Sequence, residues 1–182
     1  ILPNGTLDPS FGTAGVVTTN VGTGSAELHR VLAAPGGAIY AAGIYWNGPD
    51  ADYALLKYHS DVSLVQSFGN MGVASTPIGA GADNCYSAAL QADGKVVLAG
   101  DYYSGAGYNF GLARFLPNGT LDATFGANGV ATVDMGTTDN YGYAVTVRPN
   151  GKILLAGGHV GTTDEDFIVL QFNADGTLDT GF

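Results

Sequence analysis

Short apolar stretches recur along the chain, and each is bounded by glycine or by a turn-forming pair. Residues 141–148, YGYAVTVR, alternate between larger and smaller side chains. Residues 152–157, KILLAG, and 167–172, FIVLQF, are compact apolar segments of strand length. Alternation over two residues is typical of a β-strand, so these segments predict three successive strands.

The turns between these strands carry residues that tolerate a positive φ. Asn150-Gly151 lies between the first two strands, and Asp175-Gly176 follows the third. Such pairs are typical of tight hairpin turns. A fourth strand is predicted within residues 120–133. No segment has a convincing apolar period of 3.6 residues, so the prediction is an all-β chain.

The whole pattern repeats, and its period is marked by phenylalanines that are 57 residues apart: Phe11, Phe68, Phe125 and Phe182. The sequences between them align without a gap, and all parts are predicted to form one domain. The parts are residues 1–10 as the tail of a preceding repeat, repeats 11–67, 68–124 and 125–181, and residue 182 as the start of a next repeat.

Four antiparallel strands in a repeat of this length describe a blade of a β-propeller. Strands that are apolar on both faces fit this fold, because each blade packs between two neighbours. Tyr143, Val145 and Val147 are predicted to fill one such face. An open β-solenoid is the alternative, although its coils usually have a shorter period. Propellers typically close with about four to eight blades, so three repeats predict part of a larger ring or assembly.

A resemblance to a known family supports this prediction. The segment from Pro149 to Phe182, PNGKILLAG…DFIVLQFNADGTLDTGF, resembles the bacterial delta-60 repeat family, a β-propeller repeat of secreted and surface proteins. The turn, the Ala-Gly pair, the aromatic strand and an FGxxGV motif follow in the same order in other repeats. The order of the hairpins is also similar to that of NHL-type blades. The resemblance implies a propeller fold and an extracellular setting, and it implies no catalytic residues.

The first repeat departs from the pattern at its third turn. Val62 stands where the later repeats have Gly119 and Gly176, and Val65 stands where the second repeat has Asp122. A β-branched residue resists a positive φ. The first repeat is therefore predicted to use a different turn here.

The net charge of the chain excludes some classes of binding partner. Six basic and sixteen acidic residues give a formal net charge of −10. An acidic surface repels phosphate groups, so we expect no nucleic-acid partner, and adhesion to an anionic membrane is disfavoured. No run of about 18 apolar residues predicts a membrane span. The single cysteine, Cys85, is predicted to be a small buried hydrophobe rather than a nucleophile.

A search for catalytic motifs predicts no catalytic residue. None of the common hydrolase, nucleotide-binding or metalloprotease patterns is present. His29 shares its repeat position with Tyr86 and Tyr143, which favours a packed or hydrogen-bonded strand residue. Arg30 stands where the other repeats have uncharged residues. A charge on an inner strand must reach water or a carboxylate, and one reading is that Arg30 lines a central channel with a binding role.

The loops after the second strands and before the first strands are expected on one face. They contain nine of the sixteen carboxylates, namely Glu27, Asp50, Asp52, Asp83, Asp101, Asp139, Asp164, Glu165 and Asp166. Asp50 and Asp52 share repeat positions with Asp164 and Asp166, and these four are candidate ligands for Ca²⁺. The alternative is that they are solvated charges that keep the strand ends soluble.

The same loops carry aromatic residues, namely Tyr45, Trp46, Tyr102 and Tyr103, with His159 at a matching position. Exposed aromatic rings beside carboxylates and amides are suited to sugars, because a flat ring packs on a pyranose and the polar groups bind its hydroxyls. The alternative is that these rings pack against the next blade.

The leading functional prediction is a non-catalytic extracellular β-propeller module that acts as a structural, surface-assembly or adhesion scaffold. The alternative is a carbohydrate-binding propeller, and a third prediction is a propeller hydrolase or lyase. The expected partners are further copies of the chain or further repeats of a longer chain, with glycan as a candidate ligand. No cofactor other than Ca²⁺ is predicted.

Two predictions concern packing. Phe11, Phe68 and Phe125 should each be largely buried and should anchor the connection that follows them. Residues from about Leu7 to Thr19 are predicted to be the outer strand of a blade whose inner strands precede this chain. The chain starts with neither an initiator methionine nor a signal peptide. It is therefore expected to begin inside a longer product or after processing.

Overall fold

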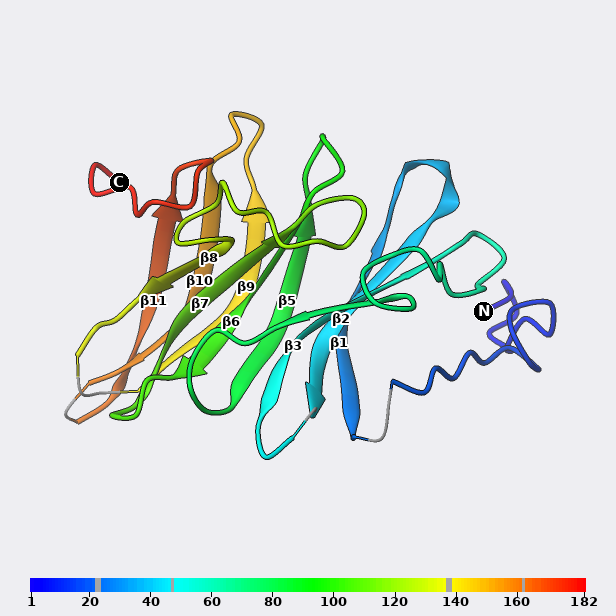
Figure 1. Ribbon diagram of the computed structural model, residues 1–182, viewed down its shortest axis with the longest axis horizontal. Helices are drawn as coiled ribbons and strands as arrows, with labels where there is room; N and C mark the ends of the chain where they lie inside the picture. The colour runs from blue at the N-terminus through cyan, green and yellow to red at the C-terminus, as the bar shows by residue number, and fades with distance from the viewer. Residues whose placement is uncertain (22–23, 47, 137–138, 162) are drawn as a thin grey trace.

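The computed structural model describes residues 1–21, 24–46, 48–136, 139–161 and 163–182. Its strands form three antiparallel sheets that lie side by side, with the two termini at opposite ends (Figure 1). The only helical element among these residues is a three-residue 3-10 turn, Pro35–Gly37. No helix in the described ranges is long and apolar enough to cross a membrane. The all-β prediction is confirmed.

We name the sheets blade 1, blade 2 and blade 3. Each blade is a simple meander, so every strand pairs with the next one along the chain. Blade 1 contains β1 (Ala26–Ala33), β2 (Ile39–Trp46), β3 (Ala51–Tyr58) and β4 (Val73–Thr76). Blade 2 contains β5 (Asp83–Leu90), β6 (Val96–Tyr103), β7 (Tyr108–Phe115) and β8 (Val130–Val133). Blade 3 contains β9 (Asn140–Val147), β10 (Ile153–Val160) and β11 (Glu165–Phe172).

The predicted strands correspond closely to the observed ones. The alternating segment 141–148 is β9, the segments 152–157 and 167–172 lie in β10 and β11, and the fourth strand within 120–133 is β8. A blade and a sequence repeat are offset from each other. The outer strands β4 and β8 follow Phe68 and Phe125, so each blade borrows its outer strand from the next repeat.

The predicted outer strand at Leu7–Thr19 is absent, and that prediction is wrong. Within this segment the structure has one isolated bridge, between Thr13 and Val16. β4 and β8 pair with the edges of β3 and β7, whereas the part of the chain that the structure describes offers residues 7–19 no such edge. The end of the segment packs instead on blade 1, where the Thr19 hydroxyl lies 2.7 Å from that of Tyr58.

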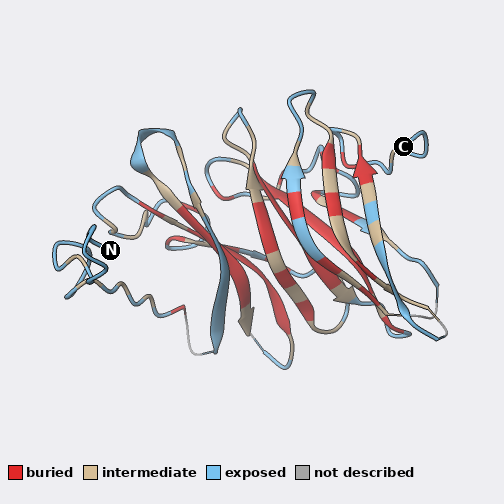
Figure 2. Ribbon diagram, turned by 180° about the vertical axis from the view of Figure 1, so that it is seen from behind, coloured by how far each residue is buried: buried red, intermediate tan, exposed pale blue. Residues whose placement is uncertain are grey.

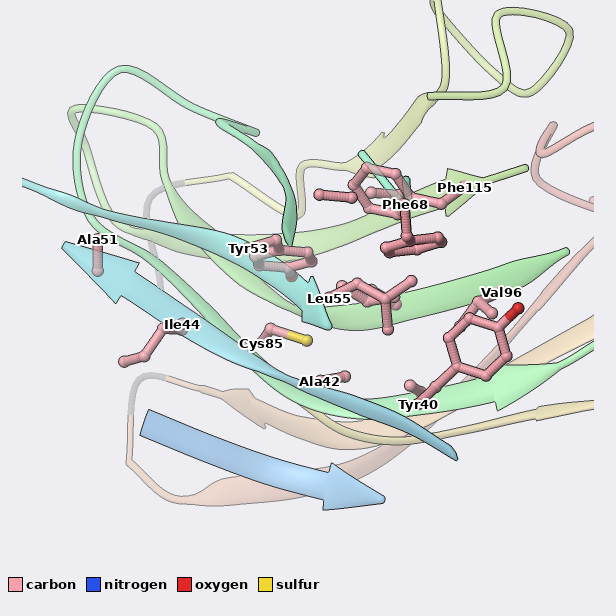
Figure 3. Packing of buried hydrophobic residues seen from close by; sticks show 14 residues of the cluster. Tyr40, Ala42, Ile44, Ala51, Tyr53, Leu55, Phe68, Cys85, Val96 and Phe115 are labelled. Atoms are coloured by element: carbon pink, nitrogen blue, oxygen red, sulfur yellow. The ribbon is translucent and has the colours of Figure 1, made fainter. Parts of the chain in front are cut away.

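The apolar core lies between the blades. We call the contact of blade 1 with blade 2 the first junction and that of blade 2 with blade 3 the second junction. Figure 3 shows the first junction, where Ile44 and Tyr53 meet Cys85 of the next blade. Val97 and Phe110 meet Val145 in the second. The central strands are therefore the most buried part of the chain, whereas β1 is mostly exposed (Figure 2).

A Phe-Gly corner joins successive blades. Phe68 and Phe125 are 1% and 0% exposed, as predicted. The residue after each one donates a hydrogen bond to the third turn of the next blade: Gly69 N to Asn118 O at 2.9 Å and Gly126 N to Asp175 O at 2.7 Å. Phe11 is 43% exposed, so its predicted burial is wrong.

Val62 distinguishes the third turn of blade 1 from the third turns of blades 2 and 3. Its φ is +62°, and its turn has the same hydrogen bonds as the turn at Gly119, so the predicted change of turn type is wrong. The effect of Val62 lies elsewhere. A Cβ at Gly119 would overlap the backbone nitrogen of Gly69, and a Cβ at Gly176 would meet Gly126 N at 2.8 Å. Val62 has a side chain at this position, so a corner docked at blade 1 in the same way would meet it.

The sheets do not close into a ring. Phe167 on β11 is fully exposed and Val169 is 51% exposed, whereas the matching residues Tyr53 and Phe110 are both 0% exposed because the following blade covers them. The outward side of β11 therefore has the apolar composition of a surface on which another blade packs.

Candidate functional site

The two ends of the blades differ in structure. The hairpins β1–β2, β5–β6 and β9–β10 turn at one end, which we call the turn face and which is uppermost in Figure 1. The loops after the second strands lie at the opposite end, which we call the loop face. These loops bond to the segments that lead into the first strands, as in Trp46 N to Ser25 O at 2.8 Å and Val160 N to Asp139 O at 2.9 Å. The predicted grouping of these loops on one face is confirmed.

Each innermost strand contains a β-bulge at the same repeat position. The register with the second strand shifts around His29 in β1, Tyr86 in β5 and Tyr143 in β9. A bulge inserts an extra residue and turns its side chain away from the regular alternation. Tyr143 is accordingly 52% exposed, while Val145 is buried in the second junction. The prediction that Tyr143 fills the same apolar face as Val145 is wrong for this reason.

The glycine of the repeated Ala-Gly pair makes the bulge possible. Gly43, Gly100 and Gly157 each lie opposite a bulge, where a Cβ would overlap the carbonyl oxygen of Glu27, Asn84 or Tyr141. Only a residue without a side chain allows the bulged backbone to come this close. The Ala-Gly signature of the sequence thus encodes the bulge and, through it, the direction of three aromatic side chains.

The bulged residues begin a continuous row of aromatic rings. The ring centroids of His29 and Tyr86 are 5.6 Å apart, and those of Tyr86 and Tyr143 are 6.0 Å apart. Tyr143 stacks on Tyr141 at 6.2 Å with an interplanar angle of 14°. The row continues from Tyr141 to Tyr108 at 6.0 Å and from Tyr108 to Tyr103 at 5.4 Å. We call these six residues the aromatic row.

The aromatic row runs from the innermost strands onto the loop face. His29, Tyr143 and Tyr103 are exposed, and the other three rings are half-buried. At the Tyr103 end, the row borders an open hollow of about 460 Å³, which is lined by Asp50, Ala80, Gly81, Ala82, Tyr103, Ser104, Gly105 and Tyr108. The row therefore offers flat ring surface together with a concave pocket edged by polar groups.

A buried carboxylate lies beside the row. Asp101 on β6 is 0% exposed, and alternation along the strand places it on the same side as Val97 and Ala99, toward the second junction. Its Oδ1 accepts a hydrogen bond of 2.8 Å from Asn84 Nδ2. Two buried side-chain oxygens of the described residues have no hydrogen-bond partner, and they are Asp101 Oδ2 and Gln91 Oε1.

Burial raises the pKa of Asp101 to about 7, and the charges of Asp83 and Asp139 act in the same direction. The carboxylate in turn acts on the rings. Burial raises the pKa of Tyr86 to about 12, and the charge of Asp101 adds to this rise. The pKa values of Tyr141 and Tyr143 are also raised, first by burial and then by nearby carboxylates that include Asp101.

Other buried polar groups on the loop face hold the loops in place. Asp83 accepts hydrogen bonds from Ile78 N at 2.6 Å and Gly79 N at 3.1 Å. Burial nevertheless raises the pKa of Asp83 to about 6. Asp139 accepts a bond of 2.9 Å from Tyr108 N, which joins blade 3 to the start of β7. These two carboxylates accept hydrogen bonds from backbone nitrogens and so hold the loops in place.

The predicted ligand-binding residues separate into groups. Tyr103 is exposed and belongs to the aromatic row. Tyr45 and Trp46 are half-buried and pack against core clusters of blade 1. The remaining three lie at different places: Tyr102 is half-buried at the end of β6, Arg30 is exposed on β1, and His159 Nδ1 lies 2.6 Å from Asn140 Oδ1.

The predicted Ca²⁺ ligands do not converge on one place. Asp50 and Asp52 belong to blade 1, and Asp164 and Asp166 belong to blade 3, with blade 2 between them. Asp52 is 8% exposed, while Asp164 and Asp166 are exposed. Within the described ranges, no group of three or more His, Cys, Asp or Glu side chains is arranged to hold a metal ion. A loss of melting temperature on addition of EDTA is the measurement that would reveal Ca²⁺ binding.

On the turn face, basic and acidic side chains form ion pairs. Arg114 Nε lies 2.8 Å from Asp122 Oδ2, and Lys95 Nζ lies 3.3 Å from the same oxygen. Although burial opposes it, hydrogen bonds from Thr124 and the charge of Arg114 lower the pKa of Asp122 to about 2. Lys152 pairs with Asp179 at 2.6 Å in blade 3. These neutralised carboxylates contrast with the unpaired Asp101 of the loop face.

Sequence reasoning missed most of the aromatic row and the role of Asp101. It treated His29, Tyr86 and Tyr143 as strand residues because it assumed regular alternation. The signal was present in the glycine of the Ala-Gly pair, which has to lie opposite a bulge. Asp101 also stands where the other repeats have Ile44 and Gly158, and a charge among apolar equivalents marks an unusual position.

Comparison with known proteins bears on the repeat. Residues 91–125 and 148–182 match the model of a family described as "Domain of unknown function (DUF5122) beta-propeller". The two segments lie in the same phase, each running from the first hairpin turn of a blade to the Phe-Gly corner. The repeat is a β-propeller repeat. The three sheets are thus propeller blades, as the sequence predicted.

The chain was also compared with solved structures and with curated protein sequences. A solved structure titled "Glycoside hydrolase" aligns with this β-propeller chain at 14% sequence identity and a TM-score of 0.47. The alignment covers 82% of this chain and 33% of that chain, so the present chain spans about a third of that protein. A search of curated protein sequences gave no match.

Proposed function

We propose that this β-propeller chain is a non-catalytic extracellular module that binds carbohydrate chains along its aromatic row. The observation that carries the proposal is the row itself, in which six rings from three blades follow one another at centroid distances of 5.4–6.2 Å. Three of the six rings, His29, Tyr86 and Tyr143, are at the bulges of the innermost strands.

The chemistry of the row suits a sugar. The C–H face of a pyranose packs on an aromatic ring, and phenol groups and carboxylates at the edge bind hydroxyls. Tyr103 and Tyr108 lie beside a hollow that also includes Asp50 and Ser104. An oligosaccharide has a length that matches a row extending over several residues, whereas a compact ligand would need only the hollow.

The extracellular setting and the adhesive role are part of the proposal. Their support is the resemblance to delta-60 repeats of secreted and surface proteins, together with a sequence whose charged fraction is only 12%. The proposal is binding rather than catalysis because the loop-face carboxylates Asp83 and Asp139 accept backbone hydrogen bonds that hold loops.

A glycan array with matched variants tests the proposal. Wild type should bind at least one oligosaccharide class, and Tyr86→Leu with Tyr143→Leu should lower that affinity by roughly tenfold or more, because both rings are lost while apolar volume is kept. Tyr45→Leu is the control, since Tyr45 is a loop-side tyrosine outside the row. Absence of glycan binding by the wild type, or equal loss in the control, would overturn the proposal.

A second role, assembly with further blades, is favoured by a separate observation. The apolar side of β11, with Phe167 and Val169, is exposed where the matching residues of the other blades are covered. We propose that it packs against a further blade, from another copy or from a longer chain. Sedimentation of wild type beside Phe167→Ser tests the version with another copy, and a single 18.5 kDa species for both proteins would contradict that version.

A further inference from the structure

The charges of the molecule are separated between its two faces. Five of the six basic residues make their contacts on the turn face: Lys57, Lys95, Arg114, Arg148 and Lys152. Arg30, on β1, is the sixth. The loop-side segments carry the nine carboxylates named from the sequence. The aromatic row therefore lies in a negative potential that attracts cations and repels anions.

Among the carboxylates that produce this negative potential, Asp101 is unusual. It is completely buried, its Oδ1 is held by Asn84, and its Oδ2 has no hydrogen-bond partner. The matching position in the first junction is Ile44, so blade packing does not require an acid here. A buried carboxylate oxygen without a partner is unfavourable unless another interaction compensates it.

The position of Asp101 relative to the rings indicates what that interaction is. Asp101 pairs across the β5–β6 hairpin with Asn84, two residues before Tyr86, and lies toward the second junction, where β9 carries Tyr141 and Tyr143. Tyr86, Tyr143 and Tyr141 are consecutive members of the aromatic row. The face of a tyrosine ring attracts a cation through its quadrupole, and the attraction increases where a negative charge lies close by. The rings thus form a surface for a cationic group, and the buried carboxylate lies behind them.

We infer that the carbohydrate bound by the aromatic row carries protonated amino groups, as in oligomers of unacetylated glucosamine. This inference rests on the proposed glycan binding and adds the charge of the ligand to it. The sugar rings pack on the tyrosines, and the ammonium groups lie over the ring faces near Asp101. Acidic glycans are repelled by the same carboxylates.

The test compares two oligomers of equal length that differ only in acetylation. Calorimetric titration at low salt should give a dissociation constant at least about tenfold lower for glucosamine hexamer than for N-acetylglucosamine hexamer. The preference should shrink in 0.5 M salt, since charge attraction is screened. A trimethylated glucosamine oligomer keeps its charge at pH 8, where Asp101 is ionised, and should retain the preference there.

Variants separate the charge from the rings. Asp101→Asn should lower the preference for the amino form several-fold and leave the affinity for the acetylated hexamer unchanged. Asp93→Asn is the matched control, because Asp93 is an exposed acid on the turn face, and it should change neither affinity. A melting curve confirms that each variant is folded.

The outcomes are distinguishable. Equal affinity for both hexamers, or a preference for acetylated or acidic glycans, would overturn the inference about charge and leave glycan binding intact. Binding of no oligomer by the wild type would overturn the proposed function itself. An unchanged preference in Asp101→Asn would show that Asp101 does not contribute to the selection of a cationic ligand.

Discussion

At their loop ends, the first and second junctions place different side chains on the same backbone. Ile44 belongs to the apolar stripe of β2 in the first junction, and Asp101 holds the matching position in the second. The Tyr53 hydroxyl of the first junction donates a hydrogen bond of 3.0 Å to Gly111 O, whereas the second has Phe110 at that place. The loop end of the first junction is thus apolar, and its Tyr53 hydroxyl is hydrogen-bonded. The loop end of the second junction buries the carboxylate of Asp101.

The difference shows that Asp101 is not there for packing. The first junction packs the same strands with an isoleucine, which gains from burial, while a carboxylate loses hydration there. At their turn ends the two junctions are alike. Lys57 lies over the ring of Phe68 and donates to Pro117 O, and Arg114 lies over Phe125. The two junctions are alike at their turn ends and differ at their loop ends. The unusual buried acid of the second junction therefore belongs to the loop face.

Ile44→Asp would give the first junction the acid of the second and should have the largest effect. The loss of a buried isoleucine and the burial of a carboxyl group should together lower the free energy of unfolding by about 4–6 kcal/mol at pH 8. Urea denaturation measures this value. Ile44→Val is the control and should cost about 0.5–1.5 kcal/mol. A loss below about 1 kcal/mol in Ile44→Asp would show that the site is open to water.

Phe68→Ala and Phe125→Ala should have the next largest effects and should match each other, because the turn ends of the two junctions are equivalent. Each change removes a buried ring and should cost about 3–5 kcal/mol in free energy of unfolding. Phe11→Ala is the internal control. Since Phe11 is 43% exposed, its loss should stay below about 1 kcal/mol. Equal losses of unfolding free energy at all three positions would contradict the conclusion that the corner at Phe11 is not docked on blade 1.

The fold could be predicted from the sequence because its signals are local and repeated. The Asn-Gly and Asp-Gly turns, the alternation of 141–148 and the 57-residue period specify hairpins in a fixed order. The predicted burial of Phe68 and Phe125 followed from their repeated position. The prediction for Phe11 failed although it has the same neighbours in sequence, because burial at this position depends on contacts with residues distant in the sequence, as Phe68 shows by packing among residues of blades 1 and 2.

The site could be predicted only in part, for a physical reason. Tyr103 was named from its place in an exposed loop. Tyr86, Tyr141 and Tyr143 depend on bulges, and a bulge shifts alternation by one residue without changing the composition of the strand. The contacts between rings also join different blades, so no single repeat contains the aromatic row.

Asp101→Asn would bring the second junction nearer to the first and should stabilise the chain at pH 8. The pKa of Asp101 is about 7 in the folded chain and near its ordinary value of 3.8 in the unfolded chain. Its contribution to stability is therefore present below about pH 4 and lost as the pH rises toward 7. Removing the acid should raise the free energy of unfolding by about 1–3 kcal/mol at pH 8.

The pH dependence identifies the origin of that gain. Wild type should lose stability between about pH 4 and 7 through Asp101 and Asp83, whose pKa values are about 7 and 6. Asp101→Asn should retain only the smaller part of this loss. Asp122, with a pKa of about 2, acts oppositely, since its contribution is lost as the pH falls below about 4. A gain in Asp101→Asn that is equally large at pH 4 would exclude a charge effect.

Val62→Gly should have the smallest effect and should make the third turn of blade 1 like those of the other blades. Val62 holds a φ of +62°, which costs a β-branched residue about 1–2 kcal/mol, and the greater freedom of glycine in the unfolded chain offsets part of the gain. Thermal or urea denaturation should show a net stabilisation of about 0.5–1 kcal/mol.

The reverse change provides the control for this turn. Gly119→Val should destabilise the chain by more than Val62→Gly stabilises it, because the new side chain would both adopt a positive φ and overlap Gly69 N in the corner at Phe68. Val62→Gly also tests whether the valine side chain keeps the corner at Phe11 from docking on blade 1. If the fluorescence and exchange protection of residues near Phe11 stay unchanged in Val62→Gly, the valine acts through its own backbone strain alone. Increased protection there would show that Val62 itself keeps the first corner open.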